Sequence, residues 1–223
     1  MNATTNAPMN AIKQRLGFAK ALWGFVDLVR HPEHLDRVFE IADALASQPV
    51  FEKMRDHFAA DLQGAAALRD KPRLAVRIDA LASLPEGTLG RAFGDHLKKN
   101  GLDPASIPTL PGSTELEFMR AHLYETHDVW HAVTGFETDV AGELGLQSFY
   151  AAQMPGGLPL LLMAVGFLNA AFFATDQGQR RVEAVARGWQ MGRCARPLFG
   201  VSWGELWTRP LAEVRETLGV RPS

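Results

Sequence analysis

Two histidines and four carboxylates stand close together in the stretch HDVWHAVTGFETDVAGE, near the middle of the chain. His127 and His131 are four residues apart, so on a helix both imidazoles project from one face, with Asp128 beside them. Gly135 can end that helix, and Glu143 then falls in the first turn of the next one, able to fold back toward the histidines. Two helices and one turn could therefore supply a set of metal ligands.

Imidazole and carboxylate ligands suit a borderline divalent ion, so the set predicts zinc or iron, with cobalt and manganese also accepted. Spacing alone leaves a second interpretation open. In that interpretation His127 and His131 occupy the polar face of an ordinary helix, and Asp139 and Glu143 only cap the next one. A hydrolytic site of the H-E-x-x-H kind is disfavoured, because Asp128 is too short to replace the glutamate base.

The elements that would position these residues have the apolar periodicity of helices. Before the metal-like stretch, this pattern or the bounding prolines and glycines mark five segments: residues 11–30, 32–45, 50–63, 74–85 and 87–101. No strand-type alternation of any length is present. We therefore expect an all-α protein, with a flexible tail over residues 1–10 and a single compact helical domain over residues 11–223.

The segment LPLLLMAVGFLNAAFFAT, residues 158–175, is apolar except for Asn169 and the terminal threonine. Its length reaches the lower limit for a membrane span. We expect a buried, largely apolar central helix instead. A helix that is apolar on every face avoids water, and the core of a protein provides such surroundings as well as a membrane does. In a variant of this interpretation, the central helices line a pocket for a long hydrocarbon ligand.

Charge and cysteine content exclude some classes of protein. The 223 residues carry a formal net charge of -2, which gives no positive field for a nucleic-acid partner. The single cysteine, Cys194, excludes a disulfide framework and favours a cytoplasmic setting. The helix expected over residues 11–30 has aromatic residues near its apolar side, including Trp23 and Phe25. It could contact the inner face of the cytoplasmic membrane peripherally.

Four arginines are candidates for binding an anionic head group, because a guanidinium matches carboxylate and phosphate oxygens. They are Arg120, Arg187, Arg193 and Arg196. The alternative is an ordinary solvated basic surface. Trp130 and Trp189 are interpreted as core or interface residues rather than as partners that stack on a ring.

The metal-like stretch resembles the signature of the coenzyme Q biosynthesis protein 4 family, H-D-x-x-H followed by eleven residues and a glutamate. Upstream, LASLPEGTLGRAFGDHL resembles the family's leucine-proline-x-glycine-threonine-leucine-glycine run. The closing segment GWQMGRCARPLFGVSWGELWTRPLAEVRETLGV resembles its C-terminal arm. The chain lacks the presequence and the tyrosine-x-proline-tryptophan-alanine-like run of eukaryotic members, so it resembles a bacterial branch.

The resemblance implies that His127, Asp128, His131 and Glu143 are metal ligands and catalytic residues. It also implies a helical homodimer that binds isoprenoid lipid, sits peripherally at membranes and works with other ubiquinone-biosynthesis proteins. The implied activity is the metal-dependent oxidative decarboxylation of a prenylated benzoate, in which a hydroxyl replaces the carboxylate. The alternative is a non-catalytic, lipid-binding scaffold that organises the biosynthetic enzymes around a structural metal.

Overall fold

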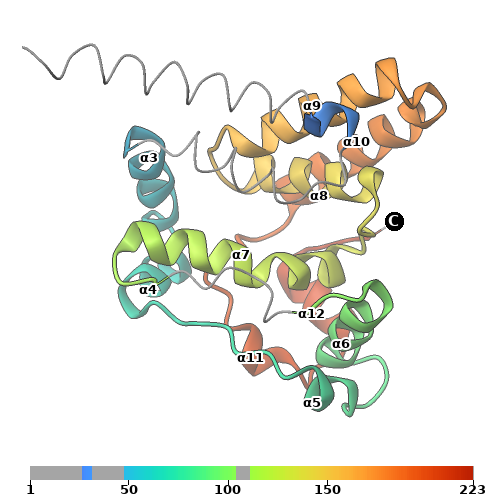
Figure 1. Cartoon of the computed structure of the whole chain (residues 1–223). Coiled ribbons are helices and arrows are strands. Elements are labelled where there is room, and N and C mark those ends of the chain that lie inside the picture. The colour runs from blue at the N-terminus through green and yellow to red at the C-terminus, as the bar shows by residue number, and fades with distance from the viewer. Residues whose placement is uncertain (1–26, 32–47, 104–110, 223) are drawn as a thin grey trace, which may run out of the picture.

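The computed structural model describes residues 27–31, 48–103 and 111–222, and this part of the chain is built from helices and loops (Figure 1). Its helices are α3 (Gln48–Ala59), α4 (Leu62–Asp70), α5 (Ile78–Ala82), α6 (Leu89–Asn100), α7 (Glu115–Thr134), α8 (Val140–Gln153), α9 (Leu158–Phe172), the 3-10 helix η2 (Thr175–Gln177), α10 (Gly178–Cys194), α11 (Trp203–Leu206) and α12 (Leu211–Leu218). No strand forms within these described ranges, which confirms the all-α prediction. The expected tail and most of the two expected N-terminal helices lie outside the described residues.

Helix α7 runs through the middle of the molecule, with α8, α9 and α10 on one side and α5, α6, α11 and α12 on the other (Figure 1). It begins with a capping box, in which the Thr114 side chain accepts from the Glu117 backbone and the Glu117 side chain accepts from the Thr114 backbone. It ends at Gly135, whose φ of 77° is the left-handed conformation that favours glycine. The helix that carries the two histidines therefore has a defined start and stop.

Two helices on one side of α7 approach each other very closely. A Cβ atom on Gly188 of α10 would lie 2.0 Å from the carbonyl oxygen of Gly145 on α8. One turn later, a Cβ on Gly192 would lie 2.8 Å from the carbonyl oxygen of Phe149. Only glycine permits this contact, so α8 is held directly against α10.

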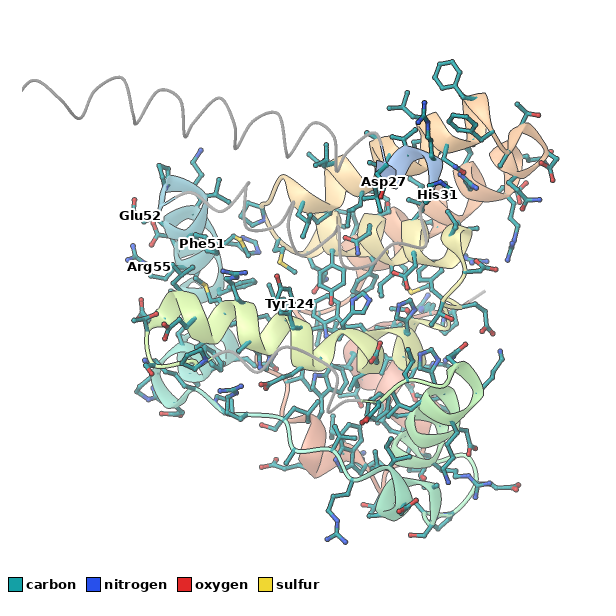
Figure 2. All side chains as sticks on the ribbon, in the orientation of Figure 1. Asp27, His31, Phe51, Glu52, Arg55 and Tyr124 are labelled. Carbon is teal, nitrogen blue, oxygen red and sulfur yellow. The ribbon has the colours of Figure 1, made fainter. Side chains whose placement is uncertain are left out.

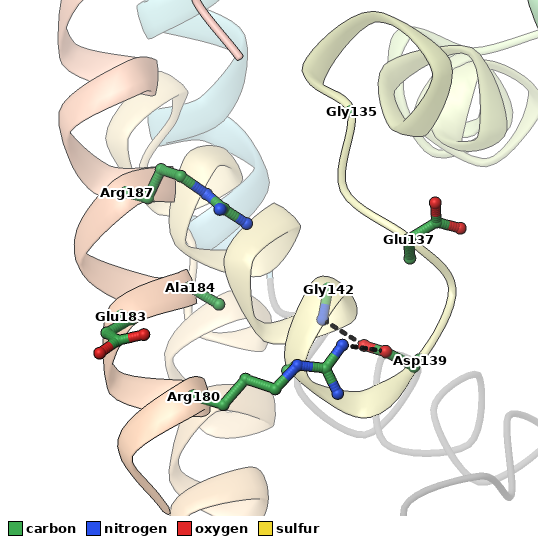
Figure 3. Close-up of a pocket in the computed structure, with 9 residues that line it drawn as sticks. Gly135, Glu137, Asp139, Gly142, Arg180, Glu183, Ala184 and Arg187 are labelled. Carbon is green, nitrogen blue, oxygen red and sulfur yellow. Dashed lines mark hydrogen bonds and ion pairs between the residues drawn. The ribbon is translucent and has the colours of Figure 1, made fainter. Parts of the chain in front are cut away.

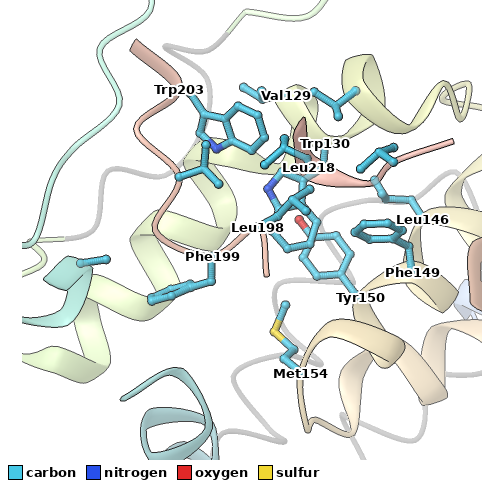
Figure 4. Packing of buried hydrophobic residues seen from close by; sticks show 14 of the residues in the cluster. Val129, Trp130, Leu146, Phe149, Tyr150, Met154, Leu198, Phe199, Trp203 and Leu218 are labelled. Atoms are coloured by element: carbon cyan, nitrogen blue, oxygen red, sulfur yellow. The ribbon is translucent and has the colours of Figure 1, made fainter. Parts of the chain in front are cut away.

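The main core contains large aromatic side chains from α7 and α8 (Figure 4). Trp130 is fully buried, as predicted for a core residue, and stacks on Tyr150 with ring centroids 4.3 Å apart. Phe149 meets the same indole edge-on at 5.7 Å. Through these contacts Trp130, which lies between the two histidines in the sequence, packs α7 against α8. Trp189 is 50% exposed and so does not belong to the core.

Helix α9 is apolar, but it is not buried all round as expected. Its inner side packs on the short segment that bears Asp27 and His31 (Figure 2), where Leu28 and Val165 form a small buried cluster. On its outer side Phe172 is 71% exposed. The helix lies at the edge of the bundle, so solvent reaches one face. Among the described helices, none has both the length and the hydrophobicity needed to cross a membrane.

Candidate metal centre

The turn between α7 and α8 brings the predicted ligands together. Gly135 ends α7, and the Asp139 side chain accepts a hydrogen bond from the Gly142 backbone at 2.8 Å, which starts α8. Glu143 then lies in the first turn of α8. The chain reverses direction over a few residues, so Glu143 folds back toward the end of α7, as its position in the sequence indicated.

His127, His131 and Glu143 form a compact group of donors, each offering one ligand atom, and these atoms all lie within 4.8 Å of one another. The Nε2 atom of His131 is 3.1 Å from Glu143 Oε1, and the Nε2 atom of His127 is 3.7 Å from Glu143 Oε2. The side chain of His131 is 1% exposed, whereas those of His127 and Glu143 are about one-third exposed. The group is thus partly buried, with an open side.

The hydrogen bonding of His131 shows that these donors fit a metal ion. Its Nδ1 atom lies 2.9 Å from the carbonyl oxygen of Phe136, which can only accept, so Nδ1 carries the hydrogen. Nε2 of His131 therefore faces Glu143 Oε1, 3.1 Å away. A metal ion at this position would be bound by the imidazole and the carboxylate together, and a backbone carbonyl that holds the other ring nitrogen is typical of metal-binding histidines.

The charges of the group are mutually stabilising. Burial acts to raise the pKa of Glu143, but the hydrogen bonds and charges of the two histidines reverse this and hold the pKa well below its usual range. Burial acts to lower the pKa of His127, but Glu143, and to a smaller extent Asp128, raise it above its ordinary value. A cation is therefore favoured beside the ionised carboxylate.

Asp128 is half-buried, and it is not one of the three clustered donors of the described residues. Successive residues of a helix are rotated by about 100°, so the side chain of Asp128 leaves the helix in a different direction from that of His127. It still acts electrostatically on His127 and on Tyr150. The structure brings three of the four predicted ligands together, and the role of Asp128 as a ligand stays a prediction.

Two side chains at the centre were not predicted from the sequence. Tyr150 of α8 places its hydroxyl 3.4 Å from His127 Nδ1. Burial raises the pKa of this phenol, and the negative charges of Asp128 and Glu143 raise it further. His96 of α6 faces the ring of His131, with centroids 5.5 Å apart. His96 lies far from the motif in the sequence, so no spacing rule could have identified it.

One of the four predicted anion-binding arginines lines a cavity that none of the three clustered metal donors lines. Arg187 lines a separate cavity of about 230 Å³ between α10 and the α7–α8 turn, together with Arg180 and Glu137 (Figure 3). In that cavity Arg180 forms an ion pair with Asp139. Arg187 lies over the ring of Phe136 at 4.9 Å. The other three candidates, Arg120, Arg193 and Arg196, do not line this cavity.

A second cavity of about 230 Å³ is lined in part by Trp130, whose ring stacks on Tyr150, and Tyr150 in turn stacks on His127. Its walls are mostly apolar, with Phe58, Met154 and Phe199 among the lining residues. A mostly apolar cavity is therefore connected to the metal donors through the contacts of Trp130 with Tyr150 and of Tyr150 with His127.

Comparison with known proteins places this geometry in a family. The profile of the family described as Coenzyme Q (ubiquinone) biosynthesis protein Coq4 matches residues 5–223. The mitochondrial ubiquinone biosynthesis protein COQ4 of Clavispora lusitaniae is 27% identical over 197 residues, which are 85% of this chain and 60% of that relative. The corresponding protein of Aspergillus fumigatus is 28% identical over 210 residues, which are 91% of this chain and 72% of that relative.

A solved structure agrees with the same assignment. A crystal structure of a Nostoc punctiforme protein, provisionally described as a ubiquinone biosynthesis protein, superposes with a TM-score of 0.79 at 27% identity. The match covers 91% of this chain and 98% of that one. The chain spans only 60% of the length of several of the fungal relatives that it matches. Because the family profile covers nearly its whole length, the chain belongs to the coenzyme Q (ubiquinone) biosynthesis protein Coq4 family.

Proposed function

We propose that this protein is a metal-dependent enzyme of ubiquinone biosynthesis that replaces the carboxylate of a prenylated aromatic acid by a hydroxyl group. The observation that supports it best is the cluster of His127, His131 and Glu143, whose ligand atoms all lie within 4.8 Å of one another. Two imidazoles and one carboxylate in this arrangement would bind a divalent ion. His127 and Glu143 are partly exposed, so a substrate could reach the ion from the open side.

In this proposal His127, His131 and Glu143 hold the ion, and Asp128 completes the set of ligands. When bound, the ion would supply positive charge to a carboxylate oxygen and, if it is iron, electron exchange with the oxidant dioxygen. The Phe136 carbonyl orients His131 through Nδ1. In the overall reaction the carboxylate leaves as carbon dioxide and one atom of dioxygen becomes the new hydroxyl, while the other atom leaves as water after taking up two protons and two electrons from an external two-electron reductant.

The apolar surroundings fit the prenyl part of such a substrate. The cavity beside Trp130 is mostly apolar, with Phe58, Met154 and Phe199 in its walls, although Asp61 and His57 also line it. Trp130 stacks on Tyr150, and Tyr150 stacks on His127, one of the metal donors. We propose that the aromatic head group binds near Tyr150 and that the tail extends into apolar space.

The first experiment measures the metal content of protein purified without a histidine tag, by elemental mass spectrometry. We expect about one equivalent of iron or zinc in the wild type, and loss of this metal in His131→Ala because one of three clustered ligands is removed. His57→Ala is the matched control, since His57 is an exposed histidine that contacts a backbone carbonyl of α8. A folded wild type without metal would contradict the proposal.

A second experiment separates catalysis from scaffolding. Glu143→Gln keeps the size of the side chain but removes its charge, and we expect a folded protein that no longer supports ubiquinone production in cells lacking their own family member. Normal ubiquinone production by this variant would contradict the enzymatic proposal. Thermal unfolding of the variant checks that any loss of function is not a loss of fold.

One observation favours the alternative function, a lipid-binding scaffold that organises other ubiquinone-biosynthesis proteins. Large apolar side chains are exposed on α9, α10 and the residue after α9, and exposed apolar patches mark interaction surfaces. They are Leu160, Leu168, Phe172, Phe173, Val182 and Trp189. A homodimer contact or a peripheral membrane contact would also use such a surface. For the scaffold, Phe172→Ser combined with Trp189→Ser should abolish ubiquinone production with the metal content unchanged.

A further inference from the structure

His96 brings a polar atom to the metal centre from outside the sequence motif. Its ring lies almost parallel to that of His131, with an interplanar angle of 19° and centroids 5.5 Å apart. The Nε2 atom of His96 is buried and has no hydrogen-bond partner among the described residues. Buried polar atoms usually have a hydrogen-bond partner, so the unpaired Nε2 of His96, whose ring lies beside the proposed metal ligand His131, requires an explanation.

The side chain of Asn100, one turn later on α6, determines which nitrogen of His96 carries the hydrogen. Thr138 Oγ1 donates to Asn100 Oδ1 over 2.9 Å, so the amide nitrogen points the other way. That nitrogen donates to the His96 backbone carbonyl at 2.9 Å and lies 3.5 Å from His96 Nδ1. A hydrogen on Nδ1 would face the amide hydrogens, so the neutral ring carries its hydrogen on Nε2.

The two facing rings therefore present complementary atoms. In His131 the Phe136 carbonyl accepts the Nδ1 hydrogen, so the buried Nε2 is the nitrogen that would bind a cation. His96 offers an N–H group, which is also buried and is unpaired among the described residues. The two ring centroids are 5.5 Å apart, so a ligand that combines a cation with an acceptor oxygen would satisfy both nitrogens, and a metal-bound anion has this composition.

Resting on the proposed metal-dependent function, we propose that His96 donates a hydrogen bond from Nε2 to an oxygen of the substrate carboxylate. A carboxylate only accepts, so it satisfies this donor and binds the cation at the same time. His96 is then a specificity-determining residue, which selects an aromatic carboxylate over the same ring without one. Thr138 and Asn100 act as positioning residues, because they fix the tautomer of His96.

The test uses the full-length protein loaded with Co²⁺, whose visible absorption reports changes at the metal. The probe is 4-hydroxybenzoate, an aromatic carboxylate without a prenyl tail. We expect a saturable spectral change in the wild type. His96→Phe keeps a ring against His131 but has no donor, so it should bind the probe about 10-fold to 100-fold more weakly, with unchanged Co²⁺ affinity. His96→Gln, which retains a donor, should recover part of the affinity.

Equal probe affinity in the wild type and His96→Phe would overturn the inference, and so would a Co²⁺-loaded wild type that does not respond to the probe. A wild type that takes up no Co²⁺ would instead contradict the proposed metal-dependent function, and this inference with it. Thr138→Val provides a test that leaves the His96 ring untouched. It removes the hydroxyl that orients Asn100, so probe binding should weaken, and unchanged binding would contradict the tautomer argument.

Discussion

Gly188 is where α10 comes closest to α8, and we predict that Gly188→Ala destabilises the protein and disturbs the metal centre. The new Cβ atom would lie 2.0 Å from the carbonyl oxygen of Gly145 and 3.2 Å from the backbone nitrogen of Phe149. Backbone atoms cannot rotate aside as a flexible side chain can. Because real Cβ contacts essentially never fall below 3.0 Å, the two helices would have to separate by about 1 Å at this point.

The magnitude follows from two opposing effects. Overpacking of this kind costs about 1–3 kcal/mol, and the upper part of the range applies because neither backbone can yield locally. Alanine recovers about 0.5–1 kcal/mol through its better helix propensity. We therefore expect the free energy of unfolding to fall by about 1–2 kcal/mol. Glu143 lies two residues before Gly145, and metal–ligand distances tolerate only about 0.2 Å, so Co²⁺ affinity should also fall.

Urea unfolding followed by circular dichroism measures the first effect, and a Co²⁺ titration measures the second. Gly178→Ala is the matched control in the same helix, because its added Cβ atom would have no neighbour within 4 Å and φ is not positive there. This control should be as stable as the wild type or more stable by about 0.5–1 kcal/mol, with unchanged Co²⁺ affinity. A Gly188→Ala protein that is at least as stable as the wild type would refute the close-packing argument.

Two further predictions concern residues outside the centre. The contribution of His122 to the free energy of unfolding should fall by about 3 kcal/mol between pH 6.5 and pH 4, because burial lowers the pKa of His122 from 6.5 to about 4. In this window His122 takes up a proton in the unfolded chain but not in the folded one. Urea unfolding across this range should show a flatter profile for His122→Gln, and an unchanged slope would contradict the assignment. Arg215→Met removes two hydrogen bonds to the last carbonyls of α7 and should cost about 1–3 kcal/mol. The exposed Arg209→Ala, just before the helix that carries Arg215, should change stability by less than about 0.5 kcal/mol, and equal losses in the same assay would argue against the anchoring role.

Helix boundaries were predictable where the signals lie within a few residues. The segment expected over residues 87–101 forms α6, because the Thr88 side chain caps its start and Gly101 takes the left-handed conformation at its end. The segment over residues 74–85 is helical only in α5. Arg73 forms an ion pair with Glu125 on α7, and the same carboxylate accepts from the Leu74 backbone. This long-range contact holds Arg73 and Leu74, which precede α5, in a non-helical conformation. It cannot be predicted from the residues near Leu74 because its partner lies far along the chain.

The metal centre likewise combines features that the local sequence predicts with features that only tertiary packing determines. Gly135, Asp139 and the four-residue spacing of the histidines are local features, so the sequence alone was sufficient to predict that Glu143 folds back toward α7. The position of His96 against His131, the contact of Tyr150 with His127 and the exposure of one face of α9 were decided only by tertiary packing. Hydrogen bonds within a turn depend on adjacent residues, whereas contacts between helices depend on how every buried side chain in the bundle fits against the others.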